Sequence, residues 1–232
     1  MSDSRQAKIQ QARRQFALSL AIAMAVSLGL YAYGAIRSHT LAFTYLPWNL
    51  FLAVVPLVVA VRLVKVLRTK NWSDWGPIGY TLVWLLFLPN SFYMISDYIH
   101  LAEVSREHVL YAAVLFTAFI CLGVLMGFCS LYLVHRELRR HLSRYAAAAW
   151  VAGTLLLCSV AIYIGRDLRW NSWDVLFSPA GLLFDVSDRL LRPDAYPEMF
   201  VTVMSFFALL TGLYVVVWSG AKLLRTARAT DS

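Results

Sequence analysis

The chain has 232 residues, of which 60% are apolar and only 15% are charged, and its mean hydropathy is +0.62. A soluble domain has about 45–50% apolar and about 25% charged residues, so this composition argues against a soluble protein and predicts a polytopic membrane protein. The formal net charge is +8, but the basic residues lie in short loops beside apolar stretches, where membrane insertion and anionic headgroups explain them. We therefore expect no nucleic-acid partner.

Six apolar stretches follow one another, each close to the roughly 20 residues that cross about 30 Å of hydrocarbon. The first follows a basic pair like a signal peptide, but its apolar core exceeds the about 7–15 residues of such a peptide, so we expect it to be retained. The fold class is all-α, with one membrane domain at 16–221 and tails at 1–15 and 222–232, of which 1–12 and 226–232 should be disordered. The predicted spans are 16–36, 48–67, 77–95, 109–134, 145–165 and 199–219.

The distribution of basic residues predicts the orientation. Fifteen of the 21 Lys and Arg residues lie in the N-terminal segment, the second and fourth connections and the C-terminus. By the positive-inside rule, both termini are cytoplasmic. His135 and His141 fall near the fourth connection, and we expect both to be solvated.

Small residues within the fourth span predict close helix packing. Gly123 and Gly127 are four residues apart on one face, which lets helix backbones approach closely. They favour packing within the protein, with self-association as the alternative. The oligomeric state does not follow from the sequence.

The strongest candidate site lies where the third span ends on the outer side. If the helix continues beyond Pro89, then Asn90, Tyr93, Asp97 and His100 form one polar stripe. Asp97 precedes His100 by three residues, a spacing that lets a carboxylate orient a catalytic imidazole acting as a general base.

Two other interpretations of this segment remain open. The stripe could be a structural network at the membrane interface. Alternatively, Asp97, His100 and Glu103 could hold a divalent cation, with oxygen-rich ligation favouring Ca²⁺, Mg²⁺ or Mn²⁺. No other cofactor is implied.

The second candidate is the segment 165–174, where the fifth span leaves the membrane on the same side. Its two arginines could bind phosphate or carboxylate, and its two tryptophans suit the headgroup level or a sugar face. The alternative is an aromatic belt that anchors the protein. The binding residues predicted here are Arg166, Arg169, Trp170, Asn171, Trp173 and Asp174.

A third candidate is Asn49, which follows Trp48 at the outer start of the second span. Taken alone it is a weak signal, because tryptophan is common at membrane interfaces. Asn49 could meet Asn90 or Asn171 in a shared polar pocket.

The last outer connection, 166–198, contains an expected short helix at 179–192. Ser178 and Pro179 are a good helix start, and apolar residues then recur at helical spacing. We expect an amphipathic helix on the outer leaflet, or else a helix that packs on the connection and faces water.

These segments resemble a bacterial membrane-protein family catalogued as domain of unknown function 1361. The resemblance rests on Trp-Asn-Leu-Phe-Leu-Ala at 48–53, on Phe-Leu-Pro-Asn at 87–90 with Asp97 to Leu101, and on Arg-Trp-Asn-Ser-Trp-Asp at 169–174. It covers roughly 45–220, and the chain departs from the family pattern at Phe92 and Ser96, where proline and threonine are common. It implies a multi-helix protein of the bacterial cytoplasmic membrane and supplies no reaction.

Three functions compete. The first is an enzyme acting on a lipid headgroup or lipid-linked envelope precursor, with His100 as base, Asp97 as its orienting partner, and Arg166 and Arg169 as an anion clamp. The second is a non-catalytic scaffold or assembly partner. A transporter component is disfavoured, because the span centres contain almost no ionisable residues.

Overall fold

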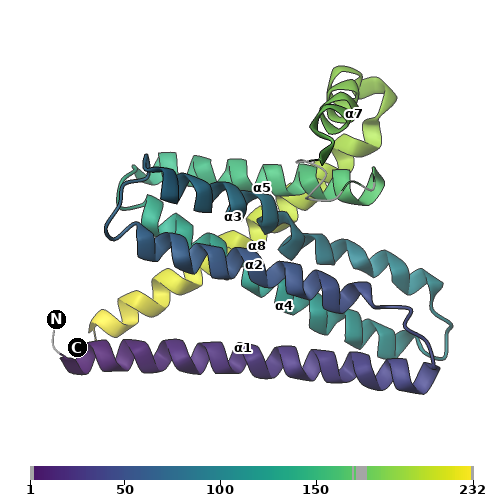
Figure 1. Ribbon diagram of the computed structural model, residues 1–232, viewed down its shortest axis with the longest axis horizontal. Helices are drawn as coiled ribbons and strands as arrows, with labels where there is room; N and C mark the ends of the chain where they lie inside the picture. The colour runs from purple at the N-terminus through teal and green to yellow at the C-terminus, as the bar shows by residue number, and fades with distance from the viewer. Residues whose placement is uncertain (1–2, 169, 171–176, 231–232) are drawn as a thin grey trace.

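The computed structural model describes residues 3–168, 170 and 177–230, and contains no strand within them. Six long helical segments form the bundle, and the third of them continues as a 3₁₀ helix (Figure 1). A shorter helix and one 3₁₀ turn precede the last long helix. The elements are α1 Asp3–Ser38, α2 Tyr45–Val66, α3 Trp75–Tyr93, η1 Met94–Glu103, α4 Val109–Leu138, α5 Arg144–Asp167, α7 Pro179–Leu191, η2 Pro193–Ala195 and α8 Pro197–Thr230.

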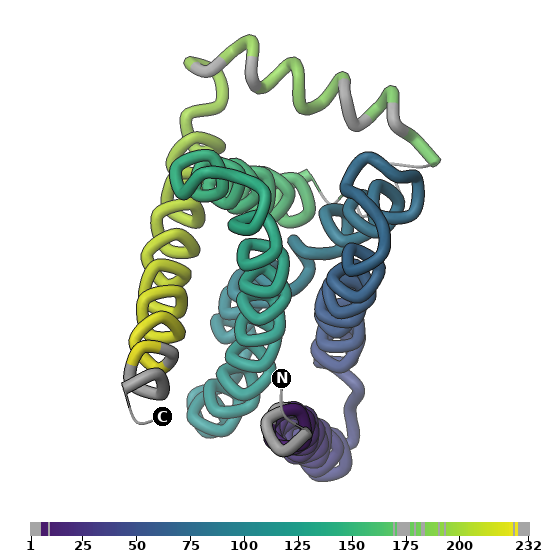
Figure 2. The backbone as a smooth tube through the Cα atoms, turned by 90° about the vertical axis from the view of Figure 1, so that its left-hand side faces the viewer, coloured from purple at the N-terminus to yellow at the C-terminus, as the bar shows by residue number. Residues whose placement is uncertain are grey.

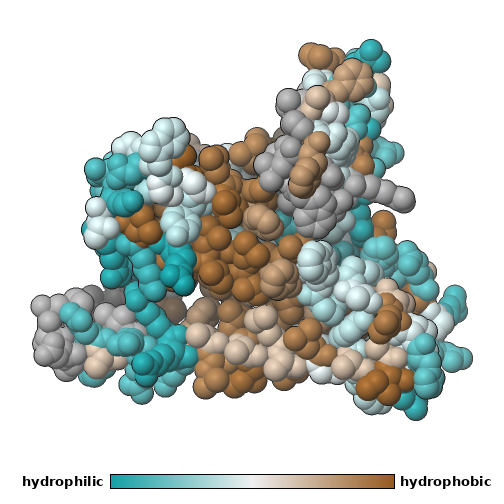
Figure 3. Space-filling view, viewed as in Figure 1, coloured by the Kyte–Doolittle hydropathy of each residue, from teal (hydrophilic) through white to brown (hydrophobic). Residues whose placement is uncertain are grey.

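The six predicted spans and the all-α class are confirmed. Six helices are long and apolar enough to cross a membrane, and they coincide with the six apolar stretches. Both termini lie at one end of the bundle (Figure 1), which we call the terminal end. Apolar side chains gather over the middle of the molecule, between polar ends (Figure 3), which is the surface that a protein inside a bilayer needs.

The expectation of disordered tails is wrong for the part of them that the structure describes. Helix α1 begins at Asp3 and α8 continues to Thr230. The segment 6–14 contains Gln, Ala, Lys and Arg, which are strong helix formers, so the helix continues out of the apolar stretch without a stop signal.

Helix α4 lies inside the bundle, with α2, α3 and α5 packed around it (Figure 2). Helices α1 and α8 are peripheral: α1 packs on α4, and α8 mainly on α5. The buried core includes Trp84, whose ring stacks on Trp150 with centroids 5.7 Å apart, and Phe119.

The third span is broken, and this break shapes the rest of the molecule. Helix α3 ends at Tyr93, and the chain turns into η1 from Met94 onward. Pro89 lacks a backbone donor and crowds the preceding turn, which weakens α3 about one turn before it ends. The predicted continuous helix carrying a polar stripe is therefore wrong, because a 3₁₀ helix has three residues per turn rather than 3.6.

The two small residues of α4 pack against this break. A Cβ added at Gly127 would lie 2.8 Å from Cβ of Ser91 and 2.9 Å from the ring of Phe92, and one added at Gly123 would overlap the sulfur of Met94. The glycine pair thus serves packing within the protein, as expected.

At the terminal end, His135 contradicts the expectation that it is solvated. It is 6% exposed, its ring stacks on Trp218 at 3.8 Å between centroids, and its Nδ1 lies 2.9 Å from the hydroxyl of Tyr214. Both aromatic partners belong to α8, so the stacking and the hydrogen bond of His135 join α4 to the last helix.

Candidate functional site

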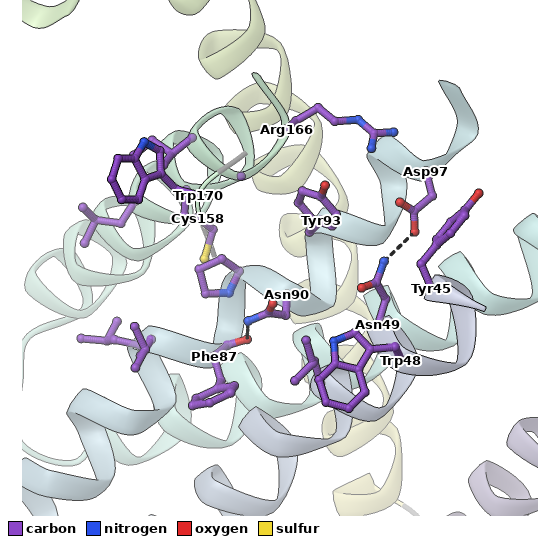
Figure 4. Close-up of a pocket in the computed structure, with 18 of the residues that line it drawn as sticks. Tyr45, Trp48, Asn49, Phe87, Asn90, Tyr93, Asp97, Cys158, Arg166 and Trp170 are labelled. Carbon is purple, nitrogen blue, oxygen red and sulfur yellow. Dashed lines mark hydrogen bonds between the residues drawn. The ribbon is translucent and has the colours of Figure 1, made fainter. Parts of the chain in front are cut away.

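A cavity of about 890 Å³ lies between α2, α3, η1 and α5 (Figure 4). Its volume falls within the roughly 300–1,000 Å³ of ligand pockets in proteins. Helix α3 packs against α5, whereas η1 packs mainly against α4. The break at Met94 therefore carries the chain away from the outer part of α5 and creates this space.

The cavity brings together residues from all three sequence segments that were singled out. Arg169, Asn171, Trp173 and Asp174 lie outside the described residues. The predicted residues that line the cavity are Asn49, Asn90, Tyr93, Asp97, His100, Arg166 and Trp170.

Asp97 is buried at 1% exposure, and its Oδ2 accepts a hydrogen bond from Nδ2 of Asn49 at 3.1 Å (Figure 4). A buried carboxylate needs such a partner, because burial without one is costly. This bond joins η1 to α2. The expected hydrogen-bonded pair of Asp97 with His100 is not formed, so Asp97 is not the group that orients the imidazole.

His100 is held by two other groups. Its Nδ1 lies 3.0 Å from Oε1 of Glu103, and its Nε2 lies 3.3 Å from Nη1 of Arg166. Arginine can only donate, so Nε2 accepts from Arg166, and Nδ1 carries the hydrogen that is donated to Glu103. The carboxylate–imidazole pair of this site is therefore Glu103–His100.

Arg166 spans the cavity from α5 to η1. Its Nη2 donates to the backbone oxygen of Ser96 at 2.5 Å, and its guanidinium lies 5.8 Å from the ring centroid of Tyr93. None of the ion pairs among the described residues includes Arg166. A guanidinium has five N–H donors, so Arg166 keeps donors for a ligand. Its charge interacts with the carboxylates of Asp97 and Asp167 without a direct ion pair to either.

Trp170 lies at the rim of the cavity and connects it to α7. Its indole Nε1 donates to Oδ2 of Asp185 at 3.0 Å. Gly181 permits this approach, since a Cβ there would lie 3.1 Å from Cη2 of the indole. Helix α7 confirms the predicted short helix, and it runs across the long helices rather than along them (Figures 1 and 2).

The alternative of a cation on Asp97, His100 and Glu103 fails on geometry. Asp97 is directed to Asn49, while His100 and Glu103 contact each other. In the part of the chain that the structure describes, no three His, Cys, Asp or Glu side chains are grouped so that they could hold a metal ion.

Sequence analysis missed Tyr45 and Cys158. Both line the cavity, and Tyr45 packs on the ring of His100 with centroids 5.0 Å apart. The Tyr45 hydroxyl is buried and has no hydrogen-bond partner among the described residues. The signal for Tyr45 was its position four residues before Asn49, which puts the two side chains on one face of α2. It was missed because the predicted span began only at 48.

The cavity has a polar half and an apolar half. The polar half lies around η1 and the start of α2. The apolar half follows α3 and α5 toward the middle of the bundle, and it is lined by Leu52, Leu82, Leu86, Leu157, Cys158 and Ala161.

Six helices able to cross a membrane, with a cavity at the break in the third, define a multi-pass membrane protein with an internal cavity. Residues 48–212 match the family model described as "Protein of unknown function (DUF1361)", and the chain belongs to this family. The match contains the described polar residues of the cavity from Asn49 to Trp170 and leaves out α1. No curated protein and no solved structure gives a significant match.

Proposed function

We propose that the protein binds a membrane lipid or a lipid-linked envelope precursor through an anionic headgroup. The observation that carries this proposal is the position of Arg166. Its guanidinium forms no direct ion pair with a carboxylate among the described residues, and it lies where the polar half of the cavity meets the apolar half.

The basic residues support an orientation for this site. Fifteen of the 21 Lys and Arg residues belong to the terminal end, so that end faces the cytoplasm and the cavity opens toward the other side. A helical bundle of a bacterial family belongs in the cytoplasmic membrane, since outer-membrane spans form barrels. Helix α7 then lies along the outer surface of this membrane.

The remaining polar groups suit a headgroup that is held at Arg166. A phosphate accepts two hydrogen bonds from one guanidinium in a planar arrangement. The Tyr45 hydroxyl and the Asn49 amide lie beside it as further partners. Trp48, which is half exposed, and Trp170 suit the headgroup level, where tryptophan is favoured.

The test compares Arg166→Gln with Arg192→Gln, which removes the same charge from an exposed side chain at the C-terminal end of α7. Native mass spectrometry after release from mixed phosphatidylglycerol and phosphatidylcholine measures which lipid is retained. Because a hydrogen bond to a charged group contributes about 1.5–3 kcal/mol, we expect the preference for the anionic lipid to fall about tenfold or more in Arg166→Gln only. Equal preference in both variants contradicts the proposal.

The Glu103–His100 pair favours a second candidate function, which is catalysis on the bound headgroup. An anionic group that pairs with Arg166 draws its N–H away from Nε2 of His100. The imidazole, oriented by Glu103, can then accept a proton from a hydroxyl or water.

Catalysis and binding are separated by His100→Ala. If the protein is an enzyme, its His100→Ala variant fails to complement a strain that lacks the gene but still retains the lipid. Glu103→Gln then lowers activity less than His100→Ala does. Full complementation by His100→Ala leaves a binding protein or a non-catalytic scaffold.

A further inference from the structure

We infer that the apolar half of the cavity is a lateral slot that takes the hydrocarbon chain of a lipid from a single leaflet. This inference rests on the proposed function, and it specifies how the ligand enters and how deep it reaches.

The side walls of the slot are apolar and open. Leu82 on α3 and Leu157 on α5 line the cavity, yet they are 63% and 62% exposed. Both residues lie in the middle of their helices, at the level of the bilayer interior. The space beside them is therefore filled by hydrocarbon, and a water-soluble ligand would gain nothing from this half of the cavity.

The floor of the slot is deeper and closed. Cys158 is 1% exposed and Thr154 is 3% exposed, and both line the cavity from α5. Thr154 does not present a free hydroxyl, because its Oγ1 donates to the backbone oxygen of Trp150 at 3.0 Å. The floor thus offers a chain a surface on which the Thr154 hydroxyl is satisfied and the free thiol of Cys158 is only a weak donor.

The length of the slot matches one leaflet. Thr154 and Arg166 are the deepest and the outermost cavity residues on the continuous helix α5, twelve residues apart. At 1.5 Å per residue this distance is about 18 Å along the helix axis. Half of a hydrocarbon core of about 30 Å is roughly 15 Å. A lipid whose headgroup lies at Arg166 therefore ends its chain near the midplane, in the orientation it has in its own leaflet.

Chain depth can be measured with photoactivatable phosphatidylglycerol in phosphatidylcholine nanodiscs. One probe carries a diazirine near the ester carbonyl, and the other carries it near the terminal methyl. Cross-linked peptides of the full chain are mapped by mass spectrometry. We expect the first probe to label α5 near Ile164 and the second to label it between Thr154 and Leu157.

A pair of variants tests whether the slot itself is occupied. Ala161→Trp places a large side chain between the two ends of the slot, whereas Val216→Trp adds the same side chain to α8, where Val216 is 70% exposed and not part of the cavity. The yield of terminal-methyl cross-links at 154–157 should fall about tenfold or more in Ala161→Trp, because excluding as few as two methylenes has an effect of that size. It should be unchanged in Val216→Trp.

The outcomes are distinct. If the terminal-methyl probe labels α5 no more than it labels α8, the slot is wrong, and this holds for the unmodified protein whether or not Ala161→Trp folds. If the protein still prefers the anionic lipid but the two probes label α5 at the same depth, the headgroup site is supported and the slot is contradicted. If phosphatidylcholine probes label α5 at the same two depths and Arg166→Gln does not change the lipid preference, the slot is supported and the anionic headgroup site is contradicted.

Discussion

Replacing Gly127 by alanine tests the close approach of α4 to the break in the third span. The added Cβ would lie 2.8 Å from Cβ of Ser91 and 2.9 Å from the ring of Phe92, whereas carbon atoms in good contact are about 3.5–4.0 Å apart. Phe92 cannot move freely, because it is fully buried and its ring packs on Phe128 with centroids 5.0 Å apart. Overpacking of this kind costs about 1–3 kcal/mol.

The control is Gly153→Ala on α5, where an added Cβ meets no atom within 4 Å. Both substitutions gain the same helix propensity, about 0.8–1.0 kcal/mol relative to glycine. The difference in the free energy of unfolding between the two variants therefore isolates the overpacking, and we expect Gly127→Ala to be less stable by about 1–3 kcal/mol.

Unfolding in mixed micelles with increasing sodium dodecyl sulfate measures this difference. Gly127→Ala should also retain less phosphatidylglycerol, since Ser91 and Phe92 lead directly into η1. Equal stability of the two variants would refute the packing of α4 against the break.

Three further predictions concern single polar groups. Tyr45→Phe should raise the free energy of unfolding without lipid by about 1 kcal/mol and weaken phosphatidylglycerol retention, because its buried hydroxyl has no partner among the described residues; a loss of stability would contradict this. Asn49→Leu should lower the free energy of unfolding by about 1–3 kcal/mol, because it leaves Asp97 buried without its hydrogen-bond partner. Adding Asp97→Leu should restore most of the lost stability, which a double-mutant cycle measures. Tyr214→Phe should lower the free energy of unfolding by about 1 kcal/mol, because it removes the hydrogen bond to His135. The same substitution should have no such effect in a protein in which His135 is already replaced by Phe.

The six spans could be predicted because each is a predominantly apolar run of about the right length, and such a run determines its structure locally. The common location of Asn49, Asn90 and Arg166 could also be predicted, since all three lie where their spans leave the membrane on the same side. Their meeting in one cavity depends on the packing of α3 on α5 and of η1 on α4, which has no local signal.

The partner of His100 could not be predicted from spacing. Pro89 signals a break but does not determine that the chain continues as a 3₁₀ helix, and the position of each side chain after Met94 depends on that. The burial of His135 was missed for a similar reason, because it depends on Tyr214 and Trp218 of α8, which are remote in sequence. The pairing of Asp97 with Asn49 likewise joins two helices rather than neighbours on one.

The ten-residue length of η1 affects how the cavity responds to an occupant. Runs of 3₁₀ helix longer than three or four residues are uncommon, because their hydrogen bonds are poorly aligned. The wall carrying Asp97 and His100 is thus less stably wound than the opposite wall, which is the regular helix α5. A ligand of imperfect shape would be accommodated by rewinding η1, and amide hydrogen exchange in this segment should slow when the cavity is filled.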